Sequence, residues 1–151
     1  EDLPWLDSLA SWDRSAIVGL ARSSGWLVMH VGLPCAWGRT ASLRDRLVAD
    51  LGAVPGCTIL GGLASPGDAA AAPAPVVAVR IAGWPARDAL DELGARVFAI
   101  AAASPVLDAL RFSIGAWNTE DELARLVDGI RLLAEHSPGS LPPRRTLEVL
   151  S

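Results

Sequence analysis

The sequence predicts an α+β fold in which a small, mostly antiparallel sheet is covered by helices on one face. Three observations lead to this prediction. Short runs rich in β-branched residues come in closely spaced pairs, segments with helical spacing of apolar residues flank them, and the connections between them are rich in Pro and Gly. The chain has 151 residues, 51% of them hydrophobic, which is enough apolar material for one ordinary core.

Two helices are predicted in the first third of the chain, after an irregular entry segment. Apolar residues recur near helical spacing over residues 13–33, which indicates the first helix. Pro34 suits the first turn of the second helix, whose apolar stripe includes Leu43, Leu47 and Leu51. The stripe should lie on the sheet. Four charged residues of this helix should mostly face solvent: Arg39, Arg44, Arg46 and Asp50.

The middle of the chain predicts two strands, a loop and a third helix. The strands are "CTILGG" and "VVAVRIAG", and the Ala-, Pro- and Gly-rich segment between them predicts a loop. Pro85 opens the helix, and Gly94 should close it as a left-handed cap.

The last third predicts two more strands and the best-defined helix. "RVFAIA" and "LRFSIG" are the strands, with a turn at "SPVLDA" between them. Thr119 as N-cap and Glu122 three residues later form a capping box, in which each residue accepts a backbone hydrogen bond from the other. A helix should therefore begin directly after Thr119.

Composition and charge exclude several function classes. The net charge is -4 and the pI is about 5.1, whereas a nucleic-acid surface needs clustered Lys and Arg. No apolar run reaches the roughly 18 residues that cross a bilayer. Cys35 and Cys57 have no metal or redox spacing, so we interpret them as buried free thiols, with a disulfide between them as the less favoured alternative. We therefore expect a cytoplasmic protein that binds neither nucleic acid nor membranes.

The chain contains no lysine. A mechanism that needs a lysine Schiff base cannot operate on this chain alone. The chain also begins at Glu1 rather than at Met, and we expect it to be part of a longer protein.

One arginine stands in the middle of a predicted strand. In "LRFSIG", Leu110, Phe112 and Ile114 should point to one face, and Arg111 and Ser113 to the other. With the apolar set against the helices, Arg111 should lie on the uncovered face of the sheet. A guanidinium held there suits a carboxylate, which it can bind through two parallel hydrogen bonds. The alternative is an ordinary surface ion pair.

The segment "LRFSIGAWNTEDELARLVDGIRLLAEHSP" resembles the C-terminal signature of class V aminotransferases, the cysteine-desulfurase-like pyridoxal-phosphate enzymes. In that signature an Arg-x-Ser strand leads through an aromatic-Asn-Thr turn into a final helix. Other segments, among them "LGAVPGCTILGG" and "SLPPRRTLEVL", are similar in order to the isopenicillin-N-epimerase-like branch. The resemblance covers nearly all of the chain.

The resemblance implies a fold-type-I enzyme that uses pyridoxal 5'-phosphate. Such an enzyme has a large α/β domain that binds the cofactor and a small α+β domain, and it works as a homodimer. Residues 1–33 would be the entry segment and helix leading from an absent large domain, and residues 34–151 the small C-terminal domain. The missing lysine would belong to the large domain, so the isolated chain would be inactive.

The resemblance also assigns individual residues. Arg111 matches the arginine that holds the carboxylate of an amino-acid substrate, and Asn118 and Thr119 match the turn that shapes the helix start. Ser11 matches a threonine that binds the cofactor phosphate of the other subunit. No residue of this chain matches a catalytic group or a metal ligand.

One departure from the family bears on the reaction. Cysteine desulfurases carry a reactive cysteine on a loop before the Arg-x-Ser strand, whereas "IAAASPVLDA" has none. Persulfide chemistry is therefore disfavoured, which leaves epimerisation, carbon–sulfur lysis and transamination. The alternative function, from another class, is a free-standing, non-catalytic binding or interaction module derived from such a domain.

Overall fold

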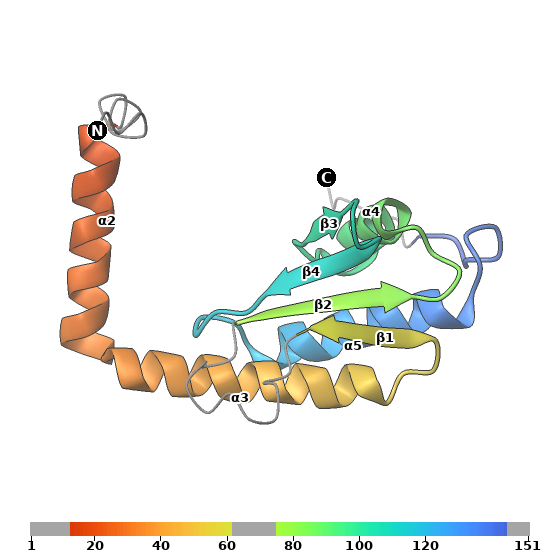
Figure 1. Cartoon of the computed structure of the whole chain (residues 1–151), viewed down its shortest axis with the longest axis horizontal. Helices are drawn as coiled ribbons and strands as arrows, with labels where there is room; N and C mark the ends of the chain where they lie inside the picture. The colour runs from red at the N-terminus through yellow and green to blue at the C-terminus, as the bar shows by residue number, and fades with distance from the viewer. Residues whose placement is uncertain (1–12, 62–74, 145–151) are drawn as a thin grey trace, which may run out of the picture. The chain divides into compact units, whose positions relative to one another are not determined.

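The computed structural model describes residues 13–61 and 75–144, and it confirms the α+β fold (Figure 1). A four-stranded, fully antiparallel sheet is accompanied by α-helices. The described elements are, in order, α2 (Arg14–Trp26), η1 (Leu27–Val31), α3 (Leu33–Gly52), β1 (Cys57–Gly61), β2 (Val76–Ile81), α4 (Ala86–Val97), β3 (Ala102–Ser104), β4 (Ala109–Ser113) and α5 (Glu120–Glu135).

The chain divides into two compact units, Glu1–Gly38 and Arg39–Ser151, and the division falls inside α3. The expected domain boundary after residue 33 stays a prediction. The first unit contains α2, which begins at the N-cap Asp13, and the π-helix η1, which ends at Gly32. Gly32 has a φ of 81°, a conformation that glycine adopts without a steric penalty.

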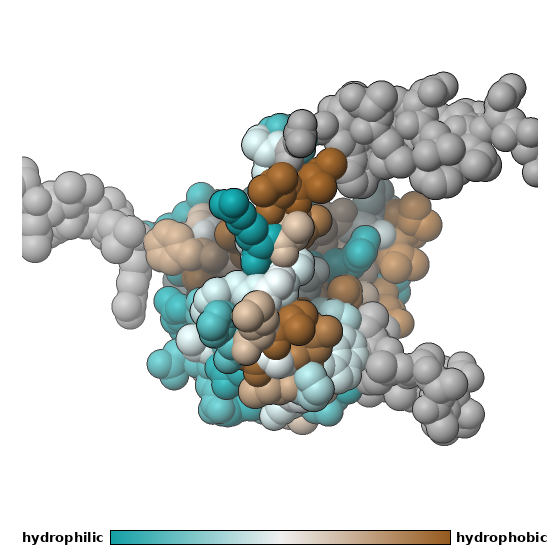
Figure 2. Space-filling model, turned by 90° about the vertical axis from the view of Figure 1, so that its left-hand side faces the viewer, coloured by the Kyte–Doolittle hydropathy of each residue, from teal (hydrophilic) through white to brown (hydrophobic). Residues whose placement is uncertain are grey.

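Helices α2 and η1 bury none of the side chains that the structure describes in them. Leu20, Trp26 and Met29 are exposed to 68%, 60% and 80%. Figure 2 shows hydrophobic residues, in brown, at the surface beside hydrophilic ones in teal. In the described segments no single helix has the length and apolar character to cross a membrane, although Ser15–Val31 and Leu33–Gly52 pass that test as a bent pair.

In the second unit the strand order is β1-β2-β4-β3, so β2 and β4 are central. Burial alternates along both central strands, as expected for a sheet with one covered face. Val77 and Val79 of β2 and Leu110 and Phe112 of β4 are buried. The alternation predicted for "LRFSIG" is therefore confirmed, and the sheet keeps one face free of the described helices.

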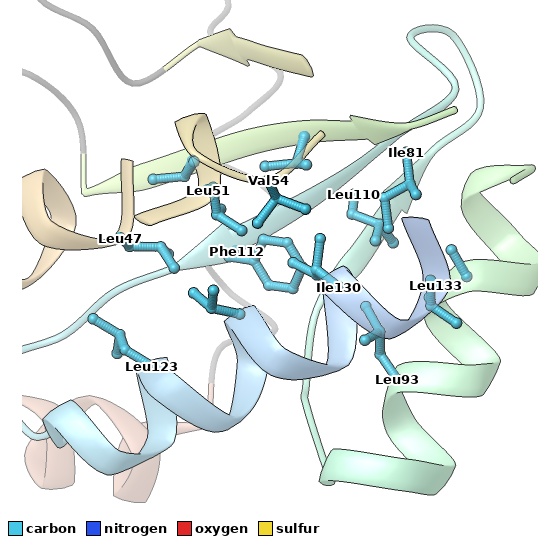
Figure 3. Packing of buried hydrophobic residues seen from close by; sticks show 14 of the residues in the cluster. Leu47, Leu51, Val54, Ile81, Leu93, Leu110, Phe112, Leu123, Ile130 and Leu133 are labelled. Carbon is cyan, nitrogen blue, oxygen red and sulfur yellow. The ribbon is translucent and has the colours of Figure 1, made fainter. Parts of the chain in front are cut away.

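The core lies between the covered face of the sheet and helices α3, α4 and α5 (Figure 3). Phe112 lies at its centre, near Leu51 of α3 and Ile130 of α5. The apolar stripe predicted for α3 is confirmed, because Leu43, Leu47 and Leu51 are all buried. Each such side chain contributes about 1.5–3 kcal/mol through burial.

The end of the third predicted helix was wrong. Helix α4 continues through Gly94 to Val97, and the left-handed C-cap is Phe98 with a φ of 57°. The helix continues because Leu93 and Val97 pack on α5, where a Cβ at Gly129 would lie 2.9 Å from Leu93 and 3.1 Å from Val97. This packing outweighs the intrinsic preference of glycine for a helix end.

The strand predicted at "RVFAIA" was also misplaced. Its first two residues end α4, and the edge strand β3 follows at Ala102–Ser104. Because Phe98 turns the chain out of α4, the residues after it reach β4 a few positions later than their composition suggests.

The prediction that Arg44 faces solvent was wrong. Arg44 is 6% exposed, because it follows Leu43 on the stripe of α3 that packs on the core. Its guanidinium makes an ion pair with Asp45, and its Nη1 has no hydrogen-bond partner among the described atoms. Arg46, by contrast, is half exposed and pairs with Glu120 at the start of α5.

Candidate functional site

The uncovered face of the sheet is the first part of the candidate site. Arg111 lies on this face in β4, and it is exposed. Its register partners are Ala78 of β2 and Ala102 of β3, so small side chains flank it on both sides. Directly opposed residues on a sheet have Cβ atoms about 4.5–5.5 Å apart, and alanines at that distance leave the guanidinium accessible to a ligand.

Among the described residues, no hydrogen bond or ion pair engages the Arg111 guanidinium. The described ion pairs involve other arginines, which belong to the helices or to the segment after α5. The surface ion pair that was the alternative role for Arg111 is therefore not formed within the described chain. Its donors therefore have no acceptor among the described residues.

A second arginine, Arg80 of β2, lies on the same face, opposite Thr58 of β1. Its Nη2 donates a hydrogen bond of 2.6 Å to the Leu107 carbonyl oxygen, in the turn between β3 and β4. Arg80 comes two residues after Ala78, the partner of Arg111, so the two arginines are diagonal neighbours on adjacent strands. Diagonal neighbours are about 7–8 Å apart.

The connection from β4 to α5 holds the end of the Arg111 strand in place. The Gly115 backbone N–H donates to Asn118 Oδ1 at 2.8 Å, which closes the turn. Arg39 of α3 donates to the carbonyl oxygens of Ala116 at 2.7 Å and Asn118 at 2.9 Å. The turn role expected for Asn118 is thus seen in its contacts, and α3 supplies a clamp from a distant part of the sequence.

Gly115 is required by the ring that lies over it. A Cβ at this position would lie 2.3 Å from Cε2 of Trp117, closer than any real contact. Trp117 itself is 84% exposed, so its ring covers the glycine while most of its surface faces outward.

The capping box at the start of α5 is confirmed. The Glu122 backbone N–H donates to Thr119 Oγ1 at 3.2 Å, and the Thr119 N–H donates to Glu122 Oε2 at 2.9 Å. The bond from the Thr119 backbone N–H, with a further one from the Asn118 amide, holds the pKa of the Glu122 carboxyl below its usual value. The carboxylate therefore stays ionised at the positive end of the helix.

A cavity of about 300 Å³ lies between the end of β4, the start of α5 and the segment after α4. Ser113, the strand neighbour of Arg111 on the uncovered face, contributes to it, whereas Arg111 does not. Most of the residues that line it are apolar, and Glu122 and Arg125 are its charged members. The cavity and the Arg111 face are therefore separate features that meet near Ser113.

The remaining site predictions have different outcomes. Ser11, the expected cofactor-phosphate residue, lies outside the described residues. Both cysteines are free, but Cys35 is exposed rather than buried. Cys57 is half buried, and burial raises the pKa of its thiol to about 11. In the described segments no three His, Cys, Asp or Glu side chains gather as metal ligands would.

Two residues of the site were missed from the sequence. Arg80 gave the same signal as Arg111, because Val77, Val79 and Ile81 alternate with it in "VVAVRI". The sequence around Arg39 contains no such pattern, since the carbonyl oxygens to which it donates lie 77 and 79 residues away in the chain.

No protein-family model matches the chain, and neither a curated protein nor a solved structure matches it.

Proposed function

We propose that this chain is the small C-terminal domain of a pyridoxal-phosphate enzyme and that Arg111 binds the carboxylate of its amino-acid substrate. The observation that carries the proposal is the position of Arg111 on the uncovered face of the sheet. The strand is held by neighbours on both sides and by the clamped turn at its end. A guanidinium on such a rigid element can bind a carboxylate through two parallel hydrogen bonds with little loss of side-chain freedom.

The described residues include the one that is assigned to the substrate and none that is assigned to the cofactor. The sequence has no lysine, and Ser11 lies outside the described residues, so no described group of this chain is assigned to the cofactor. When bound by the rest of such an enzyme, the cofactor supplies an electron sink for chemistry at an amino-acid carbon. The contribution of this chain is to bind and orient the substrate. Epimerisation, carbon–sulfur lysis and transamination all require that contribution.

The exposed apolar residues of α2 and η1 support a place in a larger protein. Leu20, Trp26 and Met29 expose apolar surface that a neighbouring domain or a second subunit would cover. A homodimer is part of the proposal. We also propose the cytoplasm as its compartment, because both cysteines are free thiols and thiols persist in a reducing environment.

The alternative function is a free-standing, non-catalytic module that binds small carboxylates through Arg111. One observation favours it: the second unit has a core of its own, to which strands β1, β2 and β4 and helices α3, α4 and α5 contribute. Such a unit can fold without a pyridoxal domain. In both functions Arg111 binds a carboxylate. The two functions differ in whether a pyridoxal-phosphate-binding domain precedes this chain.

The experiment is an NMR titration of the ¹⁵N-labelled chain with L-alanine at low ionic strength, following the arginine Nε–Hε signals. The proposal predicts a saturable shift of the Arg111 signal. Arg111→Lys should weaken binding roughly three- to tenfold, because a point charge cannot replace the two-pronged contact. The matched control is Arg87→Lys, at an exposed arginine of α4 that pairs with Asp91. An unchanged affinity of Arg111→Lys, or no saturable shift in the wild type, would overturn the proposed role.

A further inference from the structure

The uncovered face of the sheet carries more positive charge than one substrate carboxylate requires. Arg80 and Arg111 both lie on it, on the two central strands, although the whole chain has a net charge of -4. No described ion pair involves either of them. Like charges on neighbouring strands repel each other, and a bound anion would relieve that repulsion.

Both guanidinium groups have N–H donors left to bind such an anion. The described contact of Arg80 is one hydrogen bond, to the Leu107 carbonyl oxygen, and a guanidinium has five N–H donors. That bond also orients the Arg80 side chain along the face. The positions beside the two arginines hold Ala78, Ala102 and Thr58, so they add no bulk and no negative charge.

We infer that Arg80 and Arg111 together bind a ligand with two carboxylates separated by a short chain, the chemistry of an acidic amino acid. This inference rests on the proposed function, in which Arg111 holds the α-carboxylate. Arg80 then binds the second acid group. The diagonal placement of the two arginines, about 7–8 Å apart at the strand, suits two acid groups on one small molecule. Arg80 would thus determine which amino acids bind.

The test compares L-glutamate with L-glutamine, which have the same length and differ in the second carboxylate. The chain is titrated with each amino acid by NMR, as wild type and as Arg80→Gln, Arg111→Gln and the charge-matched control Arg87→Gln. We expect the wild type and the control to bind glutamate about fivefold more tightly than glutamine. Arg80→Gln should remove this preference and keep the affinity for glutamine, while Arg111→Gln should weaken both ligands.

Two results would overturn the inference, and they differ from the failure of the proposed function. If the wild type binds both amino acids equally through Arg111, the second acid site does not exist. If Arg80→Gln retains the preference for glutamate, a residue other than Arg80 binds the second carboxylate. If neither ligand depends on Arg111, the proposed function itself fails, and the inference fails with it.

Discussion

Replacing Trp84 by Phe tests how the segment after β2 is joined to the C-terminal end of α5. Trp84 follows β2 and is 5% exposed. Its indole Nε1 donates a hydrogen bond that the Leu133 carbonyl oxygen, at 2.7 Å, and the His136 carbonyl oxygen, at 2.8 Å, share at the C-terminal end of α5. Leu133 lies in the last turn of α5 and His136 is its C-cap residue, so the indole supplies a further donor to the carbonyl oxygens at this helix end. Phenylalanine keeps the apolar ring and removes the donor.

The expected loss of stability has two parts. The shared hydrogen bond is worth about 1 kcal/mol net. It does not incur the full cost of an unpaired carbonyl, because the Leu133 oxygen also accepts the His136 N–H at 3.2 Å. The smaller ring removes about three heavy atoms from a packed site, which costs roughly 1–2 kcal/mol. Together the substitution Trp84→Phe should lower the free energy of unfolding by about 2–3 kcal/mol.

The assay is urea unfolding followed by far-UV circular dichroism, which does not depend on the replaced indole. With a slope of about 1–3 kcal/mol/M, a loss of about 2–3 kcal/mol should lower the midpoint by about 0.7–3 M. Trp117→Phe is the matched control, because Trp117 is 84% exposed, and it should change stability by less than about 0.5 kcal/mol. Equal midpoints for the two variants would refute the role of Trp84.

Three further predictions concern the start of α5 and the thiols. Thr119→Ala removes the side-chain half of the capping box and should cost about 1 kcal/mol, measured by urea unfolding at pH 7. Because hydrogen bonds lower the pKa of Glu122 in the folded state below its ordinary value of 4.5, its carboxylate stabilises the fold above that value. That stability is lost as the pH falls through the lowered pKa, so the difference in stability between wild type and Glu122→Gln should shrink on acidification, and a constant difference would contradict the assignment. Iodoacetamide at pH 8 should modify exposed Cys35 well before Cys57, whose pKa of about 11 leaves little thiolate, and mass spectrometry of peptides after timed quenching reads the order.

Local patterns in the sequence predicted most of the fold. Alternation placed Phe112 inside and Arg111 outside, and the capping box located the start of α5. The burial pattern of a strand and a capping box both depend on residues within a few positions of each other, so both can be predicted from the sequence alone.

The wrong predictions depend on contacts between distant segments. Gly94 has the residue type of a helix end, but the packing of Leu93 and Val97 on Gly129 extends α4 past it. Arg44 has the charge of a surface residue, yet the orientation of α3 on the core buries it. The Arg39 clamp on the turn before α5 is of the same kind. Such contacts are set by tertiary packing, which outweighs local preference.

The measurement that tests the central claim most directly is the sequence of the gene on the 5′ side of the Glu1 codon. If the chain is the small domain of a pyridoxal enzyme, the reading frame should continue upstream through alternating strand and helix patterns and include a lysine at the end of a strand. A start codon directly before Glu1 would contradict the claim. The protein would then have no lysine for the cofactor, and the carboxylate-binding module would be the function that remains.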